Sequence, residues 1–305
     1  MAIIMILLAA GTMLILALAA GFVLGWANKA LHVKADPRVE SILAILPGAN
    51  CGGCEFIGCA DYAEALVKDG AAINKCSVGG ESCKKMIANI LGVDVTESWP
   101  YRPVVHCGAH TGDKFGRHLY QGEGTCSGAN GVAGVQGCTY GCLAFGDCER
   151  SCNFDAIHVI DGLATVDYHK CTGCGACERA CPRHIISMVP FKREKMLAVT
   201  CCNHDFGKAV KAVCKVGCIG CGACARTSAL FSMEKNLPRI DYEKYDPETA
   251  AQELELVMGK CPMKRLLSIG KPTEQDLAGV ADEKTPPDLI VDKFETTADK
   301  TEWRG

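Results

Sequence analysis

Cysteine is the residue type in this sequence whose number and spacing point most directly to chemistry. There are 22 cysteines among 305 residues, and many of them stand in short runs with two residues between neighbours. Cysteines this close together cannot brace distant parts of a fold through disulfides, whereas their thiolates suit a metal ion or an iron–sulfur cluster. We therefore expect a protein organised around thiolate-bound metal centres.

One run has the spacing of bacterial ferredoxins, in which three cysteines surround one cluster and a fourth reaches a neighbouring cluster. It consists of Cys171, Cys174, Cys177, Cys181 and Pro182. By this reciprocal arrangement we expect Cys152 to complete the site of the first three cysteines. The second site is expected to comprise Cys181, Cys138, Cys142 and Cys148. Four thiolates also bind zinc, but the duplicated C-x3-C ending before an apolar strand favours two 4Fe–4S clusters.

An internal repeat supports this pairing. The segment Gly146–Cys152 matches the segment Gly175–Cys181 twenty-nine residues later, and each copy leads into a short apolar strand, at 156–160 and 185–189. A weaker third copy has Ser228 in place of its last cysteine. We therefore expect the third unit to hold one cluster rather than two. Its ligands would be three cysteines at ferredoxin spacing and one that precedes a proline, namely Cys218, Cys221, Cys224 and Cys261.

A separate group near the N-terminus has the spacing C-x2-C-x4-C-x16-C. It consists of Cys51, Cys54, Cys59 and Cys76. The two glycines at 52 and 53 allow the backbone to lie close to an inorganic core. We expect one 4Fe–4S cluster here, although the spacing alone leaves zinc open.

Six cysteines remain outside these four sites. For Cys83 the simplest interpretation is a small buried hydrophobic residue. The other five are candidate ligands of an additional metal site, although their spacing alone does not bring them together. They are Cys107, Cys126, Cys201, Cys202 and Cys214. The expected cofactors are therefore four 4Fe–4S clusters, or five if these residues hold another.

No pattern for chemistry on a bulky substrate is present. The sequence has no Ser-His-Asp order, no phosphate-binding loop and no G-x-G-x-x-G after a strand. The net charge of −3 does not favour nucleic acid as a partner. We therefore expect electron transfer and no catalytic residues.

An apolar segment at the N-terminus is long enough to cross a membrane. Residues 2–27 contain no charged side chain, and a helix of this length spans a hydrocarbon layer of about 30 Å. A cleaved signal peptide is the alternative, but it would have a basic start and an apolar run about half as long. Lys29 and Lys34 follow the segment and predict that the rest of the chain is cytoplasmic, where reduced thiols persist.

These elements predict an α+β protein that contains small iron–sulfur domains. We expect a transmembrane anchor at 1–28, a small helical four-cysteine domain at 36–97 and a connector at 98–137. A ferredoxin-like domain with two 4Fe–4S clusters should follow at 138–200, then a degenerate ferredoxin-like unit with one cluster at 201–270. The polar residues 271–305 are expected to form a mobile tail.

The sequence resembles the B subunit of the Rnf ion-translocating oxidoreductase complex over about residues 1–265. The resemblance is carried by the apolar N-terminus and by segments in the same order, namely Ile45–Pro47, Cys51–Cys54, Gly58–Cys59, Cys76–Gly80, Cys138–Cys142, Gly146–Cys148, Phe154–Ile157 and Val216–Cys221. It implies a component of a bacterial inner-membrane complex that couples electron flow between ferredoxin and NAD to sodium or proton transport. In that family, the B subunit accepts electrons from ferredoxin and passes them through 4Fe–4S clusters to partner subunits.

The sequence departs from the family pattern at four positions. Glu55 and Ile57 stand where glycine and proline are usual, Asn153 replaces a proline, and Ser228 replaces a cysteine. Two alternative functions remain open at this point. One is a membrane-tethered zinc–thiolate interaction module, and the other is an iron–sulfur subunit of a different membrane oxidoreductase, such as a corrinoid or hydrogenase system.

Overall fold

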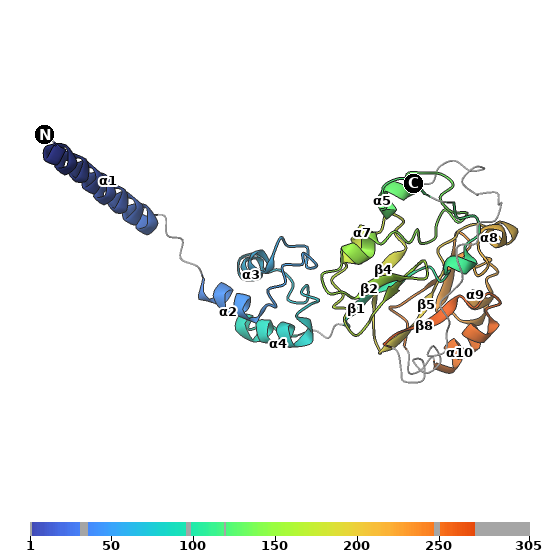
Figure 1. Ribbon diagram of the computed structural model, residues 1–305. Coiled ribbons are helices and arrows are strands. Elements are labelled where there is room, and N and C mark those ends of the chain that lie inside the picture. The colour runs from blue at the N-terminus through green and yellow to red at the C-terminus, as the bar shows by residue number, and fades with distance from the viewer. Residues whose placement is uncertain (1, 31–35, 96–98, 119, 247–250, 272–305) are drawn as a thin grey trace.

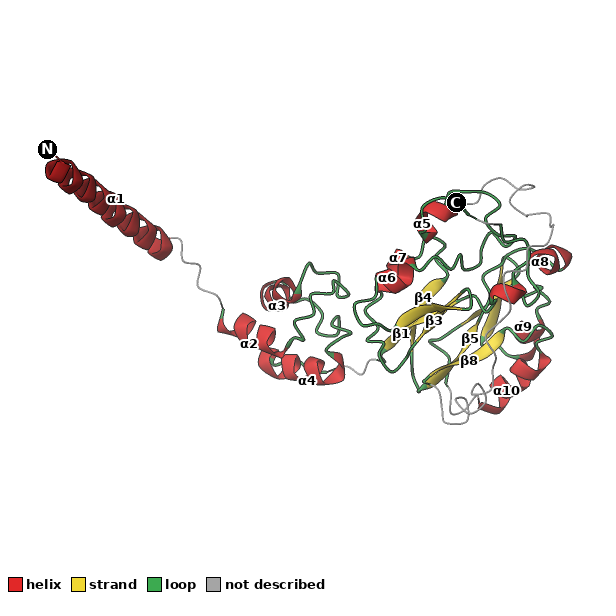
Figure 2. Ribbon diagram, in the orientation of Figure 1, coloured by secondary structure: helices red, strands yellow, loops and turns green. Residues whose placement is uncertain are grey.

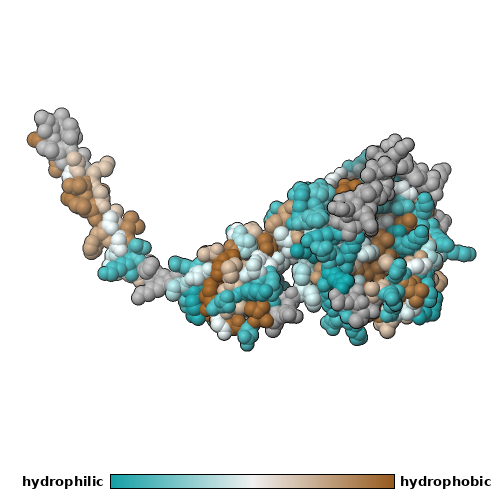
Figure 3. Space-filling model, turned by 90° about the horizontal axis from the view of Figure 1, so that it is seen from below, coloured by the Kyte–Doolittle hydropathy of each residue, from teal (hydrophilic) through white to brown (hydrophobic). Residues whose placement is uncertain are grey.

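A computed structural model describes residues 2–30, 36–95, 99–118, 120–246 and 251–271. The tail predicted from residue 271 onward therefore lies almost wholly outside the described residues. Helix α1 (Ala2–Ala30) extends away from the remaining domains (Figure 1). Over Ala10–Ala30 it is long and apolar enough to cross a membrane, and none of that stretch is buried against the protein. Hydrophobic residues are displayed along this helix in Figure 3. The structure therefore contains the predicted N-terminal apolar helix.

A small helical domain follows, formed by α2 (Pro37–Ile45), α3 (Cys59–Lys68) and α4 (Gly80–Leu91). The carboxylate of Asp36 accepts a hydrogen bond from the Arg38 amide and caps α2, as the Asp-Pro start predicts. The three helices pack their apolar faces together around Ile42, Tyr62 and Ile87. Helical packing on one side leaves the loops that carry the cysteines on the other.

The next domain has the ferredoxin-like arrangement of two strand pairs and two short helices. An outer pair joins β1 (Tyr101–Val105) to β4 (Ile186–Pro190), and an inner hairpin joins β2 (Ile157–Ile160) to β3 (Leu163–Val166); both pairs are antiparallel. Helix α6 (Asp147–Arg150) precedes the hairpin and α7 (Ala176–Ala180) follows it. The segment between β1 and α6 also holds the short 3-10 helix η1 (Thr111–Asp113) and α5 (Cys126–Asn130).

The last domain repeats this topology. Its outer pair joins β5 (Lys195–Val199) to β8 (Leu266–Gly270), and its inner hairpin joins β6 (Phe231–Glu234) to β7 (Leu237–Ile240). Helices α8 (Lys208–Val213) and α9 (Ala223–Thr227) precede the hairpin, and α10 (Ala251–Lys260) follows it. Figure 2 shows the outer pairs of the two domains side by side.

Two predicted boundaries change as a result. The stretch 98–137 is not merely a connector, because it supplies β1, which pairs with β4 across the ferredoxin-like domain. The final unit begins before residue 201, because its first strand is β5. Both differences have one physical cause: β1 and β5 pair with strands far along the chain, so neither strand has a local sequence signal.

The final unit has an apolar core where a second cluster would otherwise lie. Helix α10 takes the place in this unit that α7 and its cysteine loop have in the preceding domain. Its residues Leu254 and Val257 are buried. These side chains pack with Phe231 and Tyr245. Ser228 is buried, and its hydroxyl accepts a hydrogen bond from the Leu230 amide at 3.1 Å. Burial of these apolar side chains stabilises this half of the unit.

Candidate metal centres

The four cysteines of the N-terminal group line one cavity. The cavity is formed where α2 ends, where α3 begins at Cys59 and where the loop before α4 passes Cys76. The side chain of Asn50 accepts a hydrogen bond from the Cys59 amide at 2.8 Å and fixes the start of α3. The Gly79 amide donates to the sulfur of Cys76 at 3.3 Å. The structure thus gathers Cys51, Cys54, Cys59 and Cys76 around a common space.

Cys83 does more than fill the core of this domain. A hydrogen bond from its thiol, together with hydrogen bonds from the amides of Gly79 and Val78, lowers the pKa of Cys76 to about 6. A donor to a ligand sulfur stabilises the thiolate and tunes a bound metal centre. The simple prediction of a buried hydrophobic residue for Cys83 therefore misses a hydrogen bond that only the tertiary structure reveals.

Glu55 explains how one departure from the family pattern is tolerated. Its backbone is in the left-handed region at φ 72°, where glycine is favoured. The Glu55 carboxylate pairs with Lys75 Nζ at 2.6 Å, and this contact lowers the pKa of the carboxyl. The ion pair ties the loop of Cys54 to the loop of Cys76.

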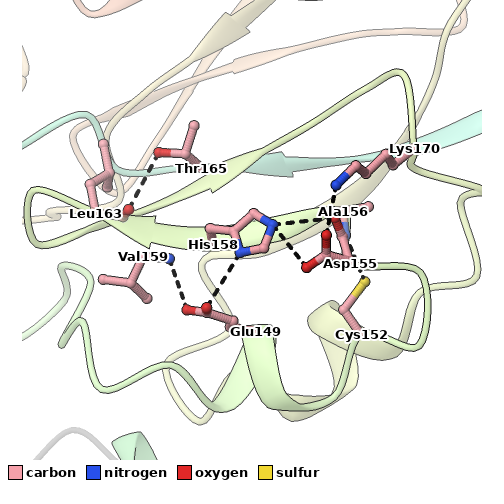
Figure 4. A network of polar contacts seen from close by, with 9 residues as sticks. All are labelled: Glu149, Cys152, Asp155, Ala156, His158, Val159, Leu163, Thr165 and Lys170. Atoms are coloured by element: carbon pink, nitrogen blue, oxygen red, sulfur yellow. Dashed lines mark hydrogen bonds and ion pairs between the residues drawn. The ribbon is translucent and has the colours of Figure 1, made fainter.

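The ferredoxin-like domain brings Cys152 to the cavity lined by Cys171, Cys174 and Cys177. The sulfur of Cys152 accepts a hydrogen bond from the Ala156 amide at 3.4 Å (Figure 4). Two further contacts hold the loop after Cys152. Glu149 Oε2 accepts a hydrogen bond from the Val159 amide at 3.0 Å, and the His158 ring lies beside the carboxylates of Glu149 and Asp155. The hydrogen bond from the Val159 amide, followed by the contact with His158, lowers the pKa of Glu149.

The other half of this domain gathers a different set from the predicted one. Burial, and after it the neighbouring thiols of Cys142, Cys126 and Cys181, raises the pKa of Cys148 to about 12. Asp147 accepts hydrogen bonds from the amides of Cys126 and Ser127 at 2.8 and 2.9 Å, so the start of α5 is tied to the start of α6. Cys126 therefore lies with Cys142, Cys148 and Cys181.

The structure places Cys138 at a different cavity from the one that local spacing predicts for it. The sulfur of Cys138 accepts hydrogen bonds from the Gly141 amide at 3.3 Å and from Asn203 Nδ2 at 3.5 Å. Cys138 lines a separate cavity together with Cys107. The difference has a physical reason: the first half of the repeat is longer than the second, so Cys126 on α5 can lie beside Cys148, where local spacing predicts Cys138.

The cysteines of the final unit also converge. Burial raises the pKa of Cys218, and the thiols of Cys261, Cys224 and Cys221 raise it further. The sulfur of Cys261 accepts a hydrogen bond from the Arg265 amide at 3.3 Å. At Cys152, too, the sulfur accepts a hydrogen bond from the amide of the residue four positions later.

The chemistry of these sites fits iron–sulfur clusters. Thiols line these sites, and backbone amides donate to several of the sulfurs. Such hydrogen bonds to ligand sulfur tune the reduction potential of an iron–sulfur cluster. The buried hydroxyls of Ser77 and Thr172 line two of the cavities and have no hydrogen-bond partner. A cluster sulfur would supply the missing acceptor. Among the described residues, no three His, Cys, Asp or Glu side chains are grouped so as to hold a single metal ion.

Two of the cysteine loops touch each other. Gly53 lies between Cys51 and Cys54, and a Cβ atom at this position would stand 2.8 Å from the carbonyl oxygen of Cys174 and 3.2 Å from its Cα. Only a hydrogen side chain permits this approach. The N-terminal site and the site of the ferredoxin-like domain therefore share a backbone contact.

Replacing Cys126 by alanine tests the revised ligand set. We expect the variant to lose about four irons per chain, because a 4Fe–4S cluster needs its fourth thiolate. Cys202→Ala is the matched control, because the Cys202 thiol donates to the carbonyl oxygen of Tyr140 at 3.3 Å, and this variant should keep the full iron content. Iron retained in Cys126→Ala would contradict the assignment.

Comparison with known proteins supports iron–sulfur binding by this chain. A family model described as an Fe-S cluster matches residues 46–78, and one described as a 4Fe-4S binding domain matches residues 164–187. The B subunit of the Na+-translocating ferredoxin:NAD+ oxidoreductase complex of Acetobacterium woodii is 39% identical over 262 residues, which cover 85% of this chain and 76% of that protein. The B subunit of the ion-translocating oxidoreductase complex of Methanosarcina acetivorans is 40% identical over 75% of this chain and 88% of that protein. The B subunit of the proton-translocating ferredoxin:NAD+ oxidoreductase complex of Clostridium ljungdahlii is 34% identical over 68% of this chain and 73% of that protein.

Proposed function

This chain belongs to the family of B subunits of ion-translocating ferredoxin:NAD+ oxidoreductase complexes, and on that premise we propose that it relays electrons from ferredoxin to partner subunits of such a complex. It is an iron–sulfur electron-transfer subunit of an oxidoreductase. In the proposed relay, ferredoxin is the electron donor, or the acceptor when the flow is reversed. Translocation of sodium ions or protons would belong to the assembled complex.

Four sites carry the proposal. A 4Fe–4S cluster bound at such a site takes up and releases one electron at a time. The proposed ligand sets are the predicted ones, except that Cys126 takes the place of Cys138. They are Cys51, Cys54, Cys59 and Cys76; Cys126, Cys142, Cys148 and Cys181; Cys152, Cys171, Cys174 and Cys177; and Cys218, Cys221, Cys224 and Cys261.

The contact between Gly53 and Cys174 is the observation that most favours a relay. Electron tunnelling slows steeply with distance, so two centres exchange electrons well only where their ligand loops approach closely. The loop of the N-terminal site meets the loop of the ferredoxin-like site backbone to backbone. The reciprocal use of Cys152 and Cys181 would then link the two sites within the ferredoxin-like domain.

Helix α1 is the proposed membrane anchor, with a single span and the cysteine-rich domains on the cytoplasmic side. Lys29 at its C-terminal end favours this orientation. The described helix contains no acidic residue, and its only basic residue is near its end. An ion pathway needs polar or ionisable groups within the membrane, so we assign the pathway to partner subunits.

Metal analysis separates this function from a zinc–thiolate module. Protein purified without oxygen is expected to contain about four irons for each cluster site, hence at least sixteen per chain, with an equal amount of acid-labile sulfide. Reduction with dithionite should produce the EPR signals of reduced clusters. Zinc in place of iron would overturn the proposed relay, because zinc does not change its oxidation state.

A further inference from the structure

Five of the six cysteines outside the four sites gather at a fifth cavity. It is lined by Cys107 after β1, by Cys138, by Cys201 and Cys202 after β5, and by Cys214 after α8. The cavity measures about 20 Å³, the same as the cavities lined by the Cys51 group and the Cys171 group. Neither family model reaches these residues, since the two matches cover 46–78 and 164–187.

We propose that Cys107, Cys138, Cys201 and Cys214 bind a fifth iron–sulfur cluster at the junction of the two ferredoxin-like units. This inference extends the proposed electron relay and rests on it. The four residues come from segments up to 107 positions apart in the sequence, from 107 to 214. The cavity itself, lined by sulfur, is the observation that joins them.

The symmetry of the two units explains why Cys107 meets Cys201. In each unit, one residue after the first strand continues the hydrogen bonding of the outer strand pair. After β1, the His106 amide donates to Ile185 O at 2.6 Å. After β5, the Thr200 amide donates to Arg265 O at 2.8 Å. The next residue is Cys107 in one unit and Cys201 in the other. These two cysteines therefore occupy equivalent positions.

Two contacts hold the equivalent ends together. His106 Nδ1 lies 2.8 Å from the carbonyl oxygen of Val199, and its Nε2 lies 2.7 Å from Ser187 Oγ. Arg265 Nη1 donates to Gly108 O at 2.9 Å. The contacts of His106 with Val199 and of Arg265 with Gly108 each connect one strand end to the other unit, so the position of the two cysteines is set by the junction itself.

Hydrogen bonding distinguishes Cys201 from its neighbour Cys202. The sulfur of Cys201 accepts a hydrogen bond from the Cys218 amide at 3.2 Å, as the sulfur of a cluster ligand does. The thiol of Cys202 instead donates to the carbonyl oxygen of Tyr140 at 3.3 Å, which requires that it keep its proton. Cys202 is therefore a structural thiol beside the site, and Cys201 is the ligand.

Two glycines lie close to the sulfurs of this cavity. A Cβ atom at Gly141 would stand 3.4 Å from the sulfur of Cys138 and 3.7 Å from that of Cys107. At Gly217 it would stand 3.6 Å from the sulfur of Cys214. The chain therefore passes within van der Waals contact of these sulfurs at both glycines.

Positive charge next to the cavity would offset the charge of four thiolates. Lys114 is buried at 3% exposure and lines the cavity together with Arg265. Arg183 donates to the carbonyl oxygens of Cys138 and Gly141 at 2.9 and 2.8 Å. Buried cations beside a thiolate cluster lower the cost of its negative charge.

The position of this site suits a link in the relay. Cys138 lies four residues before Cys142, a proposed ligand of the ferredoxin-like site, and Cys201 is hydrogen-bonded to the amide of Cys218, a proposed ligand of the final site. The fifth site thus lies between the two, and it provides the connection that an electron needs to pass from one unit to the other.

Matched variants of the full chain test the proposal by iron and acid-labile sulfide analysis, with protein prepared without oxygen. Wild-type protein should contain about twenty irons. Cys201→Ala and Cys214→Ala should each lose about four, while Cys202→Ala should keep all of them. Circular dichroism verifies that each variant is folded, and Cys107→Ser replaces any variant that is not.

The outcomes separate the fifth site from the function on which it rests. About sixteen irons in wild-type protein, unchanged in Cys201→Ala and Cys214→Ala, would overturn the fifth cluster and leave the four-site relay standing. Equal iron loss in Cys201→Ala and Cys202→Ala would overturn the choice of ligand. Protein that contains zinc and no iron would overturn the relay as a whole.

Discussion

Replacing Gly53 by valine is expected to leave the iron content of the chain unchanged and to slow electron flow from the N-terminal site to the ferredoxin-like domain. A side chain at this position would overlap the carbonyl oxygen and the Cα of Cys174. Both partners are backbone atoms, so neither can rotate away. The two cysteine loops must therefore move apart, and electron transfer between them must slow.

The size of the effect follows from the cost of overpacking. Inserting carbon atoms into a closely packed contact costs about 1–3 kcal/mol, and each 1.4 kcal/mol is about a factor of ten in an equilibrium. The population with the two loops in contact should therefore fall roughly tenfold to a hundredfold. Ferredoxin-dependent NAD+ reduction by the assembled complex measures this loss, and rapid-mixing absorbance shows which centres remain oxidised.

Gly259→Ala is a suitable control for this variant. Gly259 lies in α10, and a Cβ atom there would meet nothing within 4 Å. The control should match wild-type protein in iron content and in rate. If Gly53→Val supported wild-type rates with full iron content, the contact between Gly53 and Cys174 would not lie on the path of the electrons.

Lys114→Met should both destabilise the fold and make the neighbouring clusters harder to reduce. Lys114 Nζ donates to the carbonyl oxygens of Cys142 and Gly162 at 2.7 and 2.5 Å from a buried position. Methionine has a similar length but no donor. Two buried carbonyl oxygens would lose a partner, at about 1–3 kcal/mol each.

The change in potential has a separate electrostatic cause. Lys114 contacts the backbone of one proposed ligand and lines the cavity of the fifth site. Removing a positive charge favours the less negative, oxidised state of a cluster. An interaction of about 2 kcal/mol, typical of charges several ångströms apart at an effective dielectric constant near 20, corresponds to roughly 90 mV for one electron. Redox titration followed by EPR should show a decrease of that order.

Lys211→Met removes the same charge at an exposed position on α8. Water and salt screen an exposed charge, so this control should shift no potential and should unfold at the wild-type denaturant concentration. Equal shifts in the two variants would mean that overall charge, rather than the buried ammonium group of Lys114, sets the potential.

Local sequence determined much of this protein because several of its features depend on neighbouring residues alone. The apolar run of α1 needs only length and composition. Asp36 and Pro37 mark the start of α2 because capping acts within one turn. The C-x2-C-x2-C run places three thiols around one point by the geometry of a single loop. Cys152 joins Cys171 at a shared cavity because the repeat relates the two halves.

Tertiary structure decided which cysteines meet across long separations. Cys126 lies beside Cys148 because Asp147 holds the start of α5, a contact with no sequence spacing of its own. Cys107 meets Cys201 because two ferredoxin-like units pack strand end to strand end through His106. Outer strands that pair across a whole domain leave no local signal in the sequence. Cysteine spacing therefore could not predict which cysteines meet at the cavity of Cys107 and Cys201. Only the folded arrangement of the two units brings these thiols together.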